Sequence, residues 1–251
     1  MKKTDLGYNK NIHIYVCSDY EELSGVAADI VANEIKKNPS LTLGLATGSS
    51  PVGLYKNLIK AYKDGKIDFS KVHSYNLDEY YPISPENDQS YRYFMNENLF
   101  DGVNIDKSKT CVPDGLTKDI EAMCAAYDAH IAKTPAAVQV LGIGGNGHIG
   151  FNEPCGEFIE NTHKVELTKE TIEANARFFA SVDDVPKHAV TMGMGGIMSA
   201  EKILLVANGE GKANAVAAML KGPIEPKCPA SLLRLHKDVH VVIDASAAKY
   251  L

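Results

Sequence analysis

The sequence predicts an α/β, Rossmann-like fold, in which helices cover both faces of a mostly parallel sheet. The first observation is that short apolar segments alternate with helical segments along nearly all of the 251 residues. The second is that 45% of the residues are hydrophobic and 23% are charged, as in a globular chain with a sizeable core. No Ser- or Pro-rich linker, low-complexity tract or repeat interrupts the alternation, so we expect a single domain over residues 1–251.

Cap and turn residues delimit the elements expected in the first half of the chain. Ser18 and Glu21 form an S-x-x-E capping box that predicts the start of a helix, and Pro39 predicts its end. Pro51 suits the first turn of the next helix, for which Gly65 is the expected C-cap. The predicted strands are 12–17, 41–46 and 72–77, and the predicted helices are 18–38, 51–65 and 90–100.

The second half of the chain continues the alternation. The predicted helices are 118–133, 168–180 and 212–221, and the predicted strands are 138–143, 189–194, 203–207 and 239–243. Strands that alternate with helices imply right-handed crossovers. Ligands of such sheets bind beyond the carboxyl ends of the strands. This rule selects three polar loops, at residues 47–51, 78–82 and 144–154.

Charge and cysteine content argue against several classes of protein. Lys and Arg number 26 against 32 Asp and Glu, and this net charge of −6 disfavours nucleic acid as the main partner. Apolar runs such as 203–207 fall far short of the ~20 residues of a membrane span, and no apolar stretch follows the charged N-terminus, so we expect neither a membrane segment nor a signal peptide. Five cysteines without a C-x-x-C pair argue against a disulfide framework and fit a cytoplasmic location.

The loop at residues 47–51 favours an anion site. Thr47, Gly48 and Ser49 lie between a predicted strand and a helix N-terminus, where hydroxyls and free N–H groups can hold an anion. An ordinary capped turn explains the same residues about equally well. The spacing of a nucleotide P-loop is missing.

The segment 142–147 has the sequence GIGGNG and matches G-x-G-x-x-G after a predicted strand. We disfavour a dinucleotide site, because that fingerprint opens a helix, whereas Gly150 and Pro154 follow here within a few residues. We interpret the segment as a place where the backbone approaches a ligand closely.

Asn146, His148 and Glu153 lie within eight residues of one another in this loop. A histidine with a nearby carboxylate is the minimum set for moving protons at neutral pH, although a lone histidine or glutamate is more often structural or solvated. No further histidine stands at ligand spacing, so a metal site is disfavoured.

Two further sets of residues admit both a catalytic and a structural interpretation. Asp78 and Glu79 follow a predicted strand and suit a helix cap or turn. If Asp78 faces the same crevice as His148, it suits a base for a carbon acid. Arg177 and Lys212 are candidate cations for a phosphate, and each alone is more often a solvated surface charge.

Three strings together resemble the glucosamine-6-phosphate deaminase family. They are GLATGSSP at 44–51, NLDEY at 76–80 and LGIGGNGHIGFNEP at 141–154. The resemblance continues through ANARFF at 174–179 and VPK at 185–187, and it covers nearly the whole chain in the family's order.

The resemblance implies an enzyme that converts D-glucosamine 6-phosphate and water into D-fructose 6-phosphate and ammonia, without a metal or organic cofactor. It implies that His148 is the acid/base of ring opening, supported by Asn146 and Glu153. It also implies that Asp78 takes the C2 proton, for which we expect a carboxylate already ionised at pH 7. The implied phosphate ligands are Thr47, Gly48, Ser49, Arg177 and Lys212.

Two stretches depart from the family's pattern. Many relatives carry aspartate where this chain has Asn146, so more of the charge that would stabilise an imidazolium falls on Glu153. Relatives that N-acetylglucosamine 6-phosphate activates carry R-T-R-x-K shortly after F-N-E-P. Here the matching stretch is NTHKV at 161–165, which lacks both arginines and the lysine, so we expect no such activation.

Two other functions stay open at this point. A sugar-phosphate lactonase or isomerase of the same fold would keep the phosphate loop but would have no use for Asp78 and Glu153 together with His148. A non-catalytic sugar-phosphate sensor would be signalled by loss of the base, and Asp78 is present. The sequence also leaves open whether the chain forms a homo-oligomer.

Overall fold

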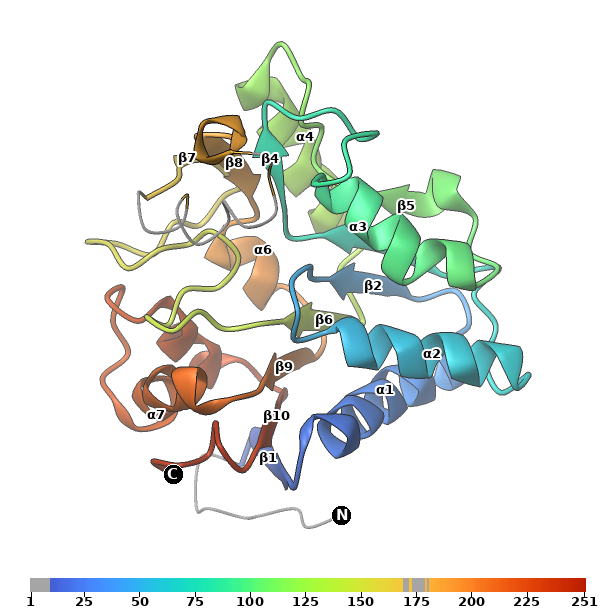
Figure 1. Cartoon of the computed structure of the whole chain (residues 1–251), viewed down its shortest axis with the longest axis vertical. Coiled ribbons are helices and arrows are strands. Elements are labelled where there is room, and N and C mark those ends of the chain that lie inside the picture. Colours follow the sequence, from blue (N-terminus) through green and yellow to red (C-terminus); the bar gives the residue numbers. More distant parts are fainter. Residues whose placement is uncertain (1–9, 169–171, 173–178, 180) are drawn as a thin grey trace.

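The computed structural model describes residues 10–168, 172, 179 and 181–251. Within these residues a seven-stranded sheet has the order β1-β10-β9-β6-β2-β3-β5, and every neighbouring pair is parallel (Figure 1). The predicted α/β class is therefore confirmed. The strands are β1 (Ile12–Cys17), β2 (Thr42–Leu45), β3 (His73–Asn76), β5 (Thr110–Cys111), β6 (Val138–Leu141), β9 (Ile203–Ala207) and β10 (Val239–Asp244).

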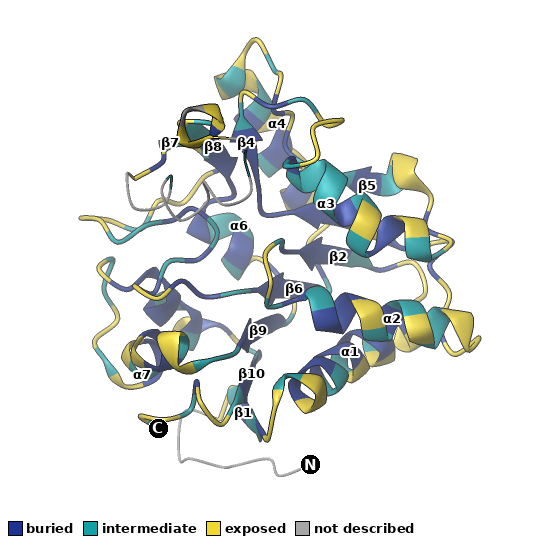
Figure 2. Cartoon of the chain, viewed as in Figure 1, coloured by how far each residue is buried: buried dark blue, intermediate teal, exposed yellow. Residues whose placement is uncertain are grey.

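Helices cover both faces of this sheet (Figure 1). One face carries α1 (Tyr20–Lys37), α2 (Val52–Lys63) and α3 (Tyr91–Asn98), and the other carries α4 (Ile120–Lys133) and α6 (Met194–Met198). A further helix, α7 (Ala213–Lys221), follows β9. The strands between these layers form the buried core of the molecule (Figure 2). The helix expected at 168–180 lies, apart from residues 168, 172 and 179, outside the described residues.

A second, smaller sheet was not expected from the sequence. It consists of β4 (Asp78–Tyr81), β8 (His188–Thr191) and β7 (His163–Glu166), all antiparallel. The expectation of a loop at 78–82 is therefore wrong. The strand expected at 189–194 is present as β8, but it ends at Thr191, before α6 begins at Met194. Strand β4 escapes notice because its sequence, DEYY, opens with two carboxylates instead of an apolar run.

The predicted helix caps are correct to within one or two residues. Asp19, not Ser18, is the N-cap of α1, and its carboxylate accepts the N–H of Glu22 at 2.8 Å. The chain offers the capping pattern in two registers, and the structure adopts the second. Helix α2 ends at Lys63, so Gly65 stands just beyond the C-cap, with a left-handed φ of 69° that suits glycine.

The backbone of Leu77 joins the two sheets. Its N–H donates to the carbonyl of Leu45 on β2 at 3.2 Å, and its carbonyl accepts the N–H of Met192, next to β8, at 2.7 Å. Strand β4 therefore begins one residue after the chain leaves the large sheet. No described helix is long and apolar enough to pass through a membrane.

Candidate active site

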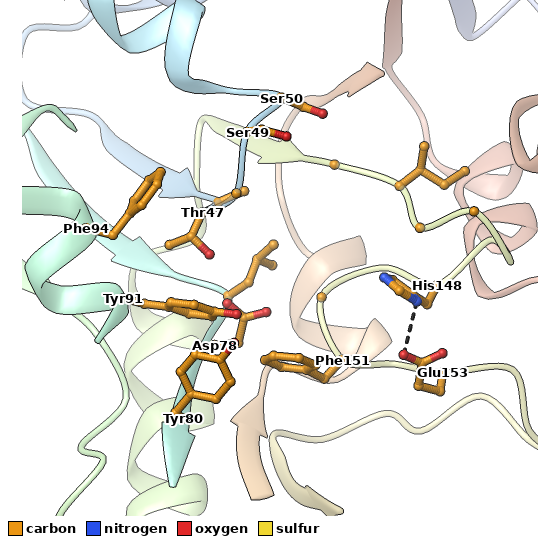
Figure 3. Close-up of a pocket in the computed structure, with 18 of the residues that line it drawn as sticks. Thr47, Ser49, Ser50, Asp78, Tyr80, Tyr91, Phe94, His148, Phe151 and Glu153 are labelled. Carbon is orange, nitrogen blue, oxygen red and sulfur yellow. Dashed lines mark ion pairs between the residues drawn. The ribbon is translucent and has the colours of Figure 1, made fainter. Parts of the chain in front are cut away.

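Four adjacent strands of the large sheet, β9, β6, β2 and β3, end at one edge, and the chain segments that follow them enclose a cavity of about 1040 Å³ (Figure 3). The structure brings nearly all of the candidate residues together in its wall. Those that line it are Thr47, Gly48, Ser49, Asp78, Asn146, His148, Glu153 and Lys212. The remaining candidate, Arg177, lies outside the described residues.

The loop between β2 and α2 forms one wall of the cavity. Gly48 has a φ of 91°, and a Cβ there would meet no atom within 4 Å, so this glycine is needed for its conformation and not for space. The hydroxyl of Tyr20 lies 2.9 Å from the carbonyl oxygen of Ser49. Ser50 donates to the side chain of Asn208 at 3.2 Å, which ties this loop to the one after β9. The loop is thus fixed from behind while Thr47, Gly48 and Ser49 face the cavity.

Lys212 also lines the cavity, from the segment between β9 and α7. Gly209 has a left-handed φ of 86°, and its N–H donates to the carboxylate of Asp244 at 2.9 Å. Partial burial lowers the pKa of Lys212. An ammonium that has lost part of its hydration gains more from a phosphate than a fully solvated one does.

His148, Glu153 and Asn146 form a connected group on another side of the cavity. The Nδ1 of His148 lies 3.0 Å from Oε1 of Glu153, at ion-pair distance but without the alignment of a linear hydrogen bond. Asn146 donates to Oε2 of Glu153 at 2.8 Å, and its amide oxygen accepts the backbone N–H of His148 at 3.1 Å. Asn146 therefore orients the carboxylate and the loop together, which an aspartate could not do with the same donor.

Two glycines allow the loop to hold the imidazole in this place. A Cβ on Gly144 would lie 2.4–2.5 Å from three atoms of the His148 ring, so the ring packs directly on the backbone. Gly147 has a φ of 89°, and a Cβ there would approach the sulfur of Cys228 to 2.7 Å. No helix occurs between residues 142 and 154, all of which are described, in agreement with the judgement against a dinucleotide site.

Asp78 is the first residue of β4, and its side chain points into the cavity although the residue is only 6% exposed (Figure 3). Burial, together with the charge of Glu79, raises the pKa of Asp78 to about 8. This raised pKa departs from the expectation of a carboxylate that is already ionised at pH 7. A Cβ on Gly150 would come within 3.2 Å of Oδ2 of Asp78, so the glycine keeps this carboxyl accessible.

Glu79 has a different role from its neighbour, because successive side chains of a strand point to opposite faces. Its carboxylate accepts three backbone N–H groups, from Tyr80 at 2.9 Å, Tyr91 at 2.8 Å and Arg92 at 3.0 Å. Two of these lie at the N-terminus of α3, where a carboxylate is stabilising. Glu79 lies in a strand and not at the helix cap or turn considered for it, but its carboxylate binds the N-terminus of α3 from the neighbouring strand, whereas Asp78 lines the cavity.

Sequence reasoning did not identify the aromatic wall beside Asp78. Tyr80 and Tyr91 have ring centroids 4.9 Å apart, and Tyr91 stacks on Phe151 with an interplanar angle of 4°. These rings line the cavity beside Asp78 and give this part of its wall a flat apolar surface (Figure 3). Tyr80 and Phe151 lie inside the strings that carried the resemblance, but Tyr91 opens an ordinary-looking helix, and only the tertiary fold shows its place.

The fold and the cavity define an α/β protein whose sheet edge combines an anion-binding loop, a buried carboxyl group and a histidine–carboxylate pair. Residues 19–242 match the model of the family of glucosamine-6-phosphate isomerases and 6-phosphogluconolactonase. The chain belongs to this family.

Individual relatives agree with this assignment. The chain is 54% identical to a glucosamine-6-phosphate deaminase of Clostridium perfringens over 96% of its length and 100% of the relative. It is 43% identical to a monomeric glucosamine-6-phosphate deaminase of known structure, with a TM-score of 0.91 over 95% of this chain and 99% of the other. A 6-phosphogluconolactonase from Thermotoga maritima, 21% identical with a TM-score of 0.74 over 93% and 99% of the two chains, shares the fold.

Proposed function

We propose that this chain is a glucosamine-6-phosphate deaminase, which converts D-glucosamine 6-phosphate and water into D-fructose 6-phosphate and ammonia. The observation that carries the proposal is the arrangement of three chemically distinct groups around one cavity. The buried carboxyl of Asp78 faces the His148–Glu153 pair across it, and the loop at 47–51 closes a third side (Figure 3). The relatives at about half identity support the same activity.

In the proposed mechanism, His148 opens the pyranose ring. It delivers a proton to the ring oxygen and takes one from the C1 hydroxyl, which leaves an open-chain aldehyde. Glu153 stabilises the imidazolium form that this transfer passes through, and Asn146 holds the Glu153 carboxylate in place. Both partners act through His148, so we assign them positioning roles.

Asp78 then moves the proton from C2 to C1. Asp78 removes the C2 proton while a proton of the substrate's ammonium group passes to the C1 oxygen, which gives a cis-enolamine. Return of the C2 proton from Asp78 to C1 gives an iminium ion at C2, which water hydrolyses to the ketose and ammonia. The raised pKa of Asp78 suits this step, since a carboxylate whose pKa lies near neutrality is a stronger base than an exposed one. The amino group of the substrate, when protonated, favours ionisation of Asp78 at the moment of binding.

The substrate's phosphate is held between Thr47, Gly48, Ser49 and the ammonium of Lys212 in this proposal. Arg177 is proposed as a further phosphate ligand on the resemblance alone. We also propose that the enzyme works in the cytoplasm, where its five unpaired cysteines suit a reducing environment.

Ammonia release from purified protein supplied with glucosamine 6-phosphate tests the proposal. We expect stoichiometric formation of ammonia and fructose 6-phosphate. A parallel incubation with 6-phosphogluconolactone tests the other activity in the family's description, and a lactonase without deaminase activity would overturn the proposal.

Replacement of Lys212 by alanine is expected to weaken binding of the phosphate. A charge-assisted hydrogen bond contributes roughly 1.5–3 kcal/mol, which corresponds to an increase in KM of about 10- to 150-fold with a smaller change in kcat. Steady-state kinetics with glucosamine 6-phosphate measures the change. Lys221→Ala, at the far end of α7, is the matched control, and an equal effect there would show that Lys212 acts only through the fold.

N-acetylglucosamine 6-phosphate is expected to act only as a competitor. The stretch that would hold it is engaged locally: Thr162 donates to Asp128, and the Nζ of Lys164 lies 5.5 Å from the ring centroid of Tyr81. Loss of two or three phosphate contacts costs more than the ~1–3 kcal/mol of typical allosteric coupling. We expect hyperbolic substrate curves at all effector concentrations. A sigmoidal curve that the effector makes hyperbolic would contradict this prediction.

A further inference from the structure

A cluster of metal-ligating side chains lies at the end of the large sheet opposite to the cavity. His13 stands near the start of β1, His240 near the start of β10, and Asp238 immediately precedes β10. The cavity is formed at the carboxyl ends of the parallel strands, whereas these residues lie at the amino ends. The proposed deaminase mechanism uses none of them.

We propose that His13, Asp238 and His240 form a binding site for a divalent transition-metal ion of the zinc type. His13 and His240 are register partners on adjacent parallel strands, so their side chains project from the same face of the sheet. Two imidazoles and one carboxylate are a donor set that zinc, cobalt, nickel and copper accept. One donor atom from each residue lies within 4.8 Å of the other two.

The distances between the donor atoms suit a single ion. The Nε2 of His13 lies 3.6 Å from Oδ1 of Asp238, and the Nε2 of His240 lies 3.0 Å from the same oxygen. Two ligands that each stand 2.0–2.1 Å from a tetrahedral ion are about 3.3 Å apart, between these two values. The two distances from the imidazoles to the carboxylate are thus close to those of a coordinated arrangement, and the donor atoms of the two histidines lie within 4.8 Å of each other.

The surroundings orient the donors before any ion binds. The hydroxyl of Tyr15 lies 3.1 Å from Nδ1 of His240 and leaves Nε2 directed at the carboxylate. A hydrogen bond to the second ring nitrogen is the usual outer partner of a metal-bound histidine. Asp238 is itself fixed through its backbone, since its N–H donates to His236 at 3.1 Å and its carbonyl accepts the N–H of Ile203 at 2.9 Å.

Lys202 competes with a metal ion for the side chains of Asp238 and His240. Its ammonium pairs with Oδ2 of Asp238 and lies 3.2 Å from Nε2 of His240. Because the histidines face Oδ1, the lysine can keep its contact with Oδ2 and give up only the one with His240 when an ion enters. Its long stem allows this movement.

Titration of metal-free protein with ZnCl2 by calorimetry, and with CoCl2 by visible absorption, tests the proposal. We expect one ion per chain and a cobalt spectrum of tetrahedral type. Changes to outer partners of a metal site cost about 10- to 100-fold in affinity, so loss of a ligand in His13→Asn or Asp238→Asn should cost about 100-fold or more, and Tyr15→Phe should fall between. His73→Asn, which removes an exposed histidine elsewhere, should bind like wild type.

A variant of Lys202 provides the most discriminating test of the proposed metal site. Lys202→Met keeps the aliphatic stem and removes the ammonium, and we expect it to bind zinc at least about 10-fold more tightly than wild type. Zinc should raise the Tm of the wild type and of His73→Asn but not that of His13→Asn. Binding that survives in His13→Asn, the absence of binding in Lys202→Met, or an unchanged affinity there would each overturn the proposal. None of these measurements depends on the deaminase activity.

Discussion

Asp78→Asn should lose about 10²–10⁴-fold in kcat while its affinity for glucosamine 6-phosphate stays close to that of wild type. The amide preserves the shape of the side chain but cannot accept the C2 proton. Exchange of that proton with deuterated water should fall by the same factor as turnover, since both require the same step. Turnover within a few-fold of wild type would show that another group is the base.

The pH dependence provides an independent check on Asp78. In the free enzyme, kcat/KM should rise with pH up to about 8, because the carboxyl must lose its proton to act as a base. Stability should move in the opposite direction. The pKa is raised from 3.8 in the unfolded chain to about 8 in the fold, so ionisation of Asp78 costs stability as the pH rises through that window, and Asp78→Asn removes this contribution.

Glu79→Gln is the matched control, since it alters the adjacent carboxylate. It should lower the free energy of unfolding by roughly 1–3 kcal/mol, because the amide nitrogen of glutamine cannot accept all three backbone N–H groups that the two carboxylate oxygens accept. The exchange at C2 should remain coupled to turnover in this variant. Equal losses of exchange in the two variants, at temperatures where both are folded, would contradict the division of roles.

His148→Asn should also lose about 10²–10⁴-fold in kcat, but at a different step. Without the imidazole, the pyranose must open unassisted before Asp78 can act. The distinction appears in the reverse direction, with fructose 6-phosphate and ammonia as substrates. Exchange at C1 of the ketose bypasses opening of the aminosugar ring, so it should persist in His148→Asn and be lost in Asp78→Asn.

Glu153→Gln tests the supporting role of Glu153 in ring opening. The amide retains an oxygen near Nδ1 of His148 but carries no charge, so we expect a loss smaller than that of His148→Asn and confined to the forward direction. A loss of C1 exchange as large as in Asp78→Asn would place Glu153 at the enolisation step instead.

The sequence was sufficient to predict the large sheet except for its edge strand β5, because most of its strands are short apolar runs, whereas β5 has only two residues, Thr110 and Cys111. Strand β9, at 203–207, has the predicted bounds, and the other strands expected in this sheet differ from them by at most two residues at either end. The small sheet could not be predicted in the same way. Strand β7, with the sequence HKVE, has no apolar run, and its pairing with β8 depends on residues far away in the chain.

The candidate site was predictable to the extent that its residues stand in loops after apolar strands. The parallel topology alone brings the loops at 47–51 and 144–154 to one edge. The pKa of Asp78 could not be predicted, because it is raised mainly by burial, which only the tertiary fold determines. The separation of Asp78 from Glu79 likewise required the knowledge that they belong to a strand.

The two backbone hydrogen bonds of Leu77, one to each sheet, have a consequence for how this site can change in evolution. The 47–51 loop, which is proposed to bind the phosphate, follows β2 of the large sheet. The proposed base, Asp78, belongs to β4 of the small sheet. The hydrogen bonds of Leu77 fix the distance between the phosphate-binding loop and Asp78. Mutations in the small sheet can thus change which carbon of a sugar phosphate lies next to the carboxylate of Asp78, without changing how the phosphate is bound. Because phosphate binding and proton transfer depend on different sheets, phosphate recognition and reaction position can diverge independently within this fold.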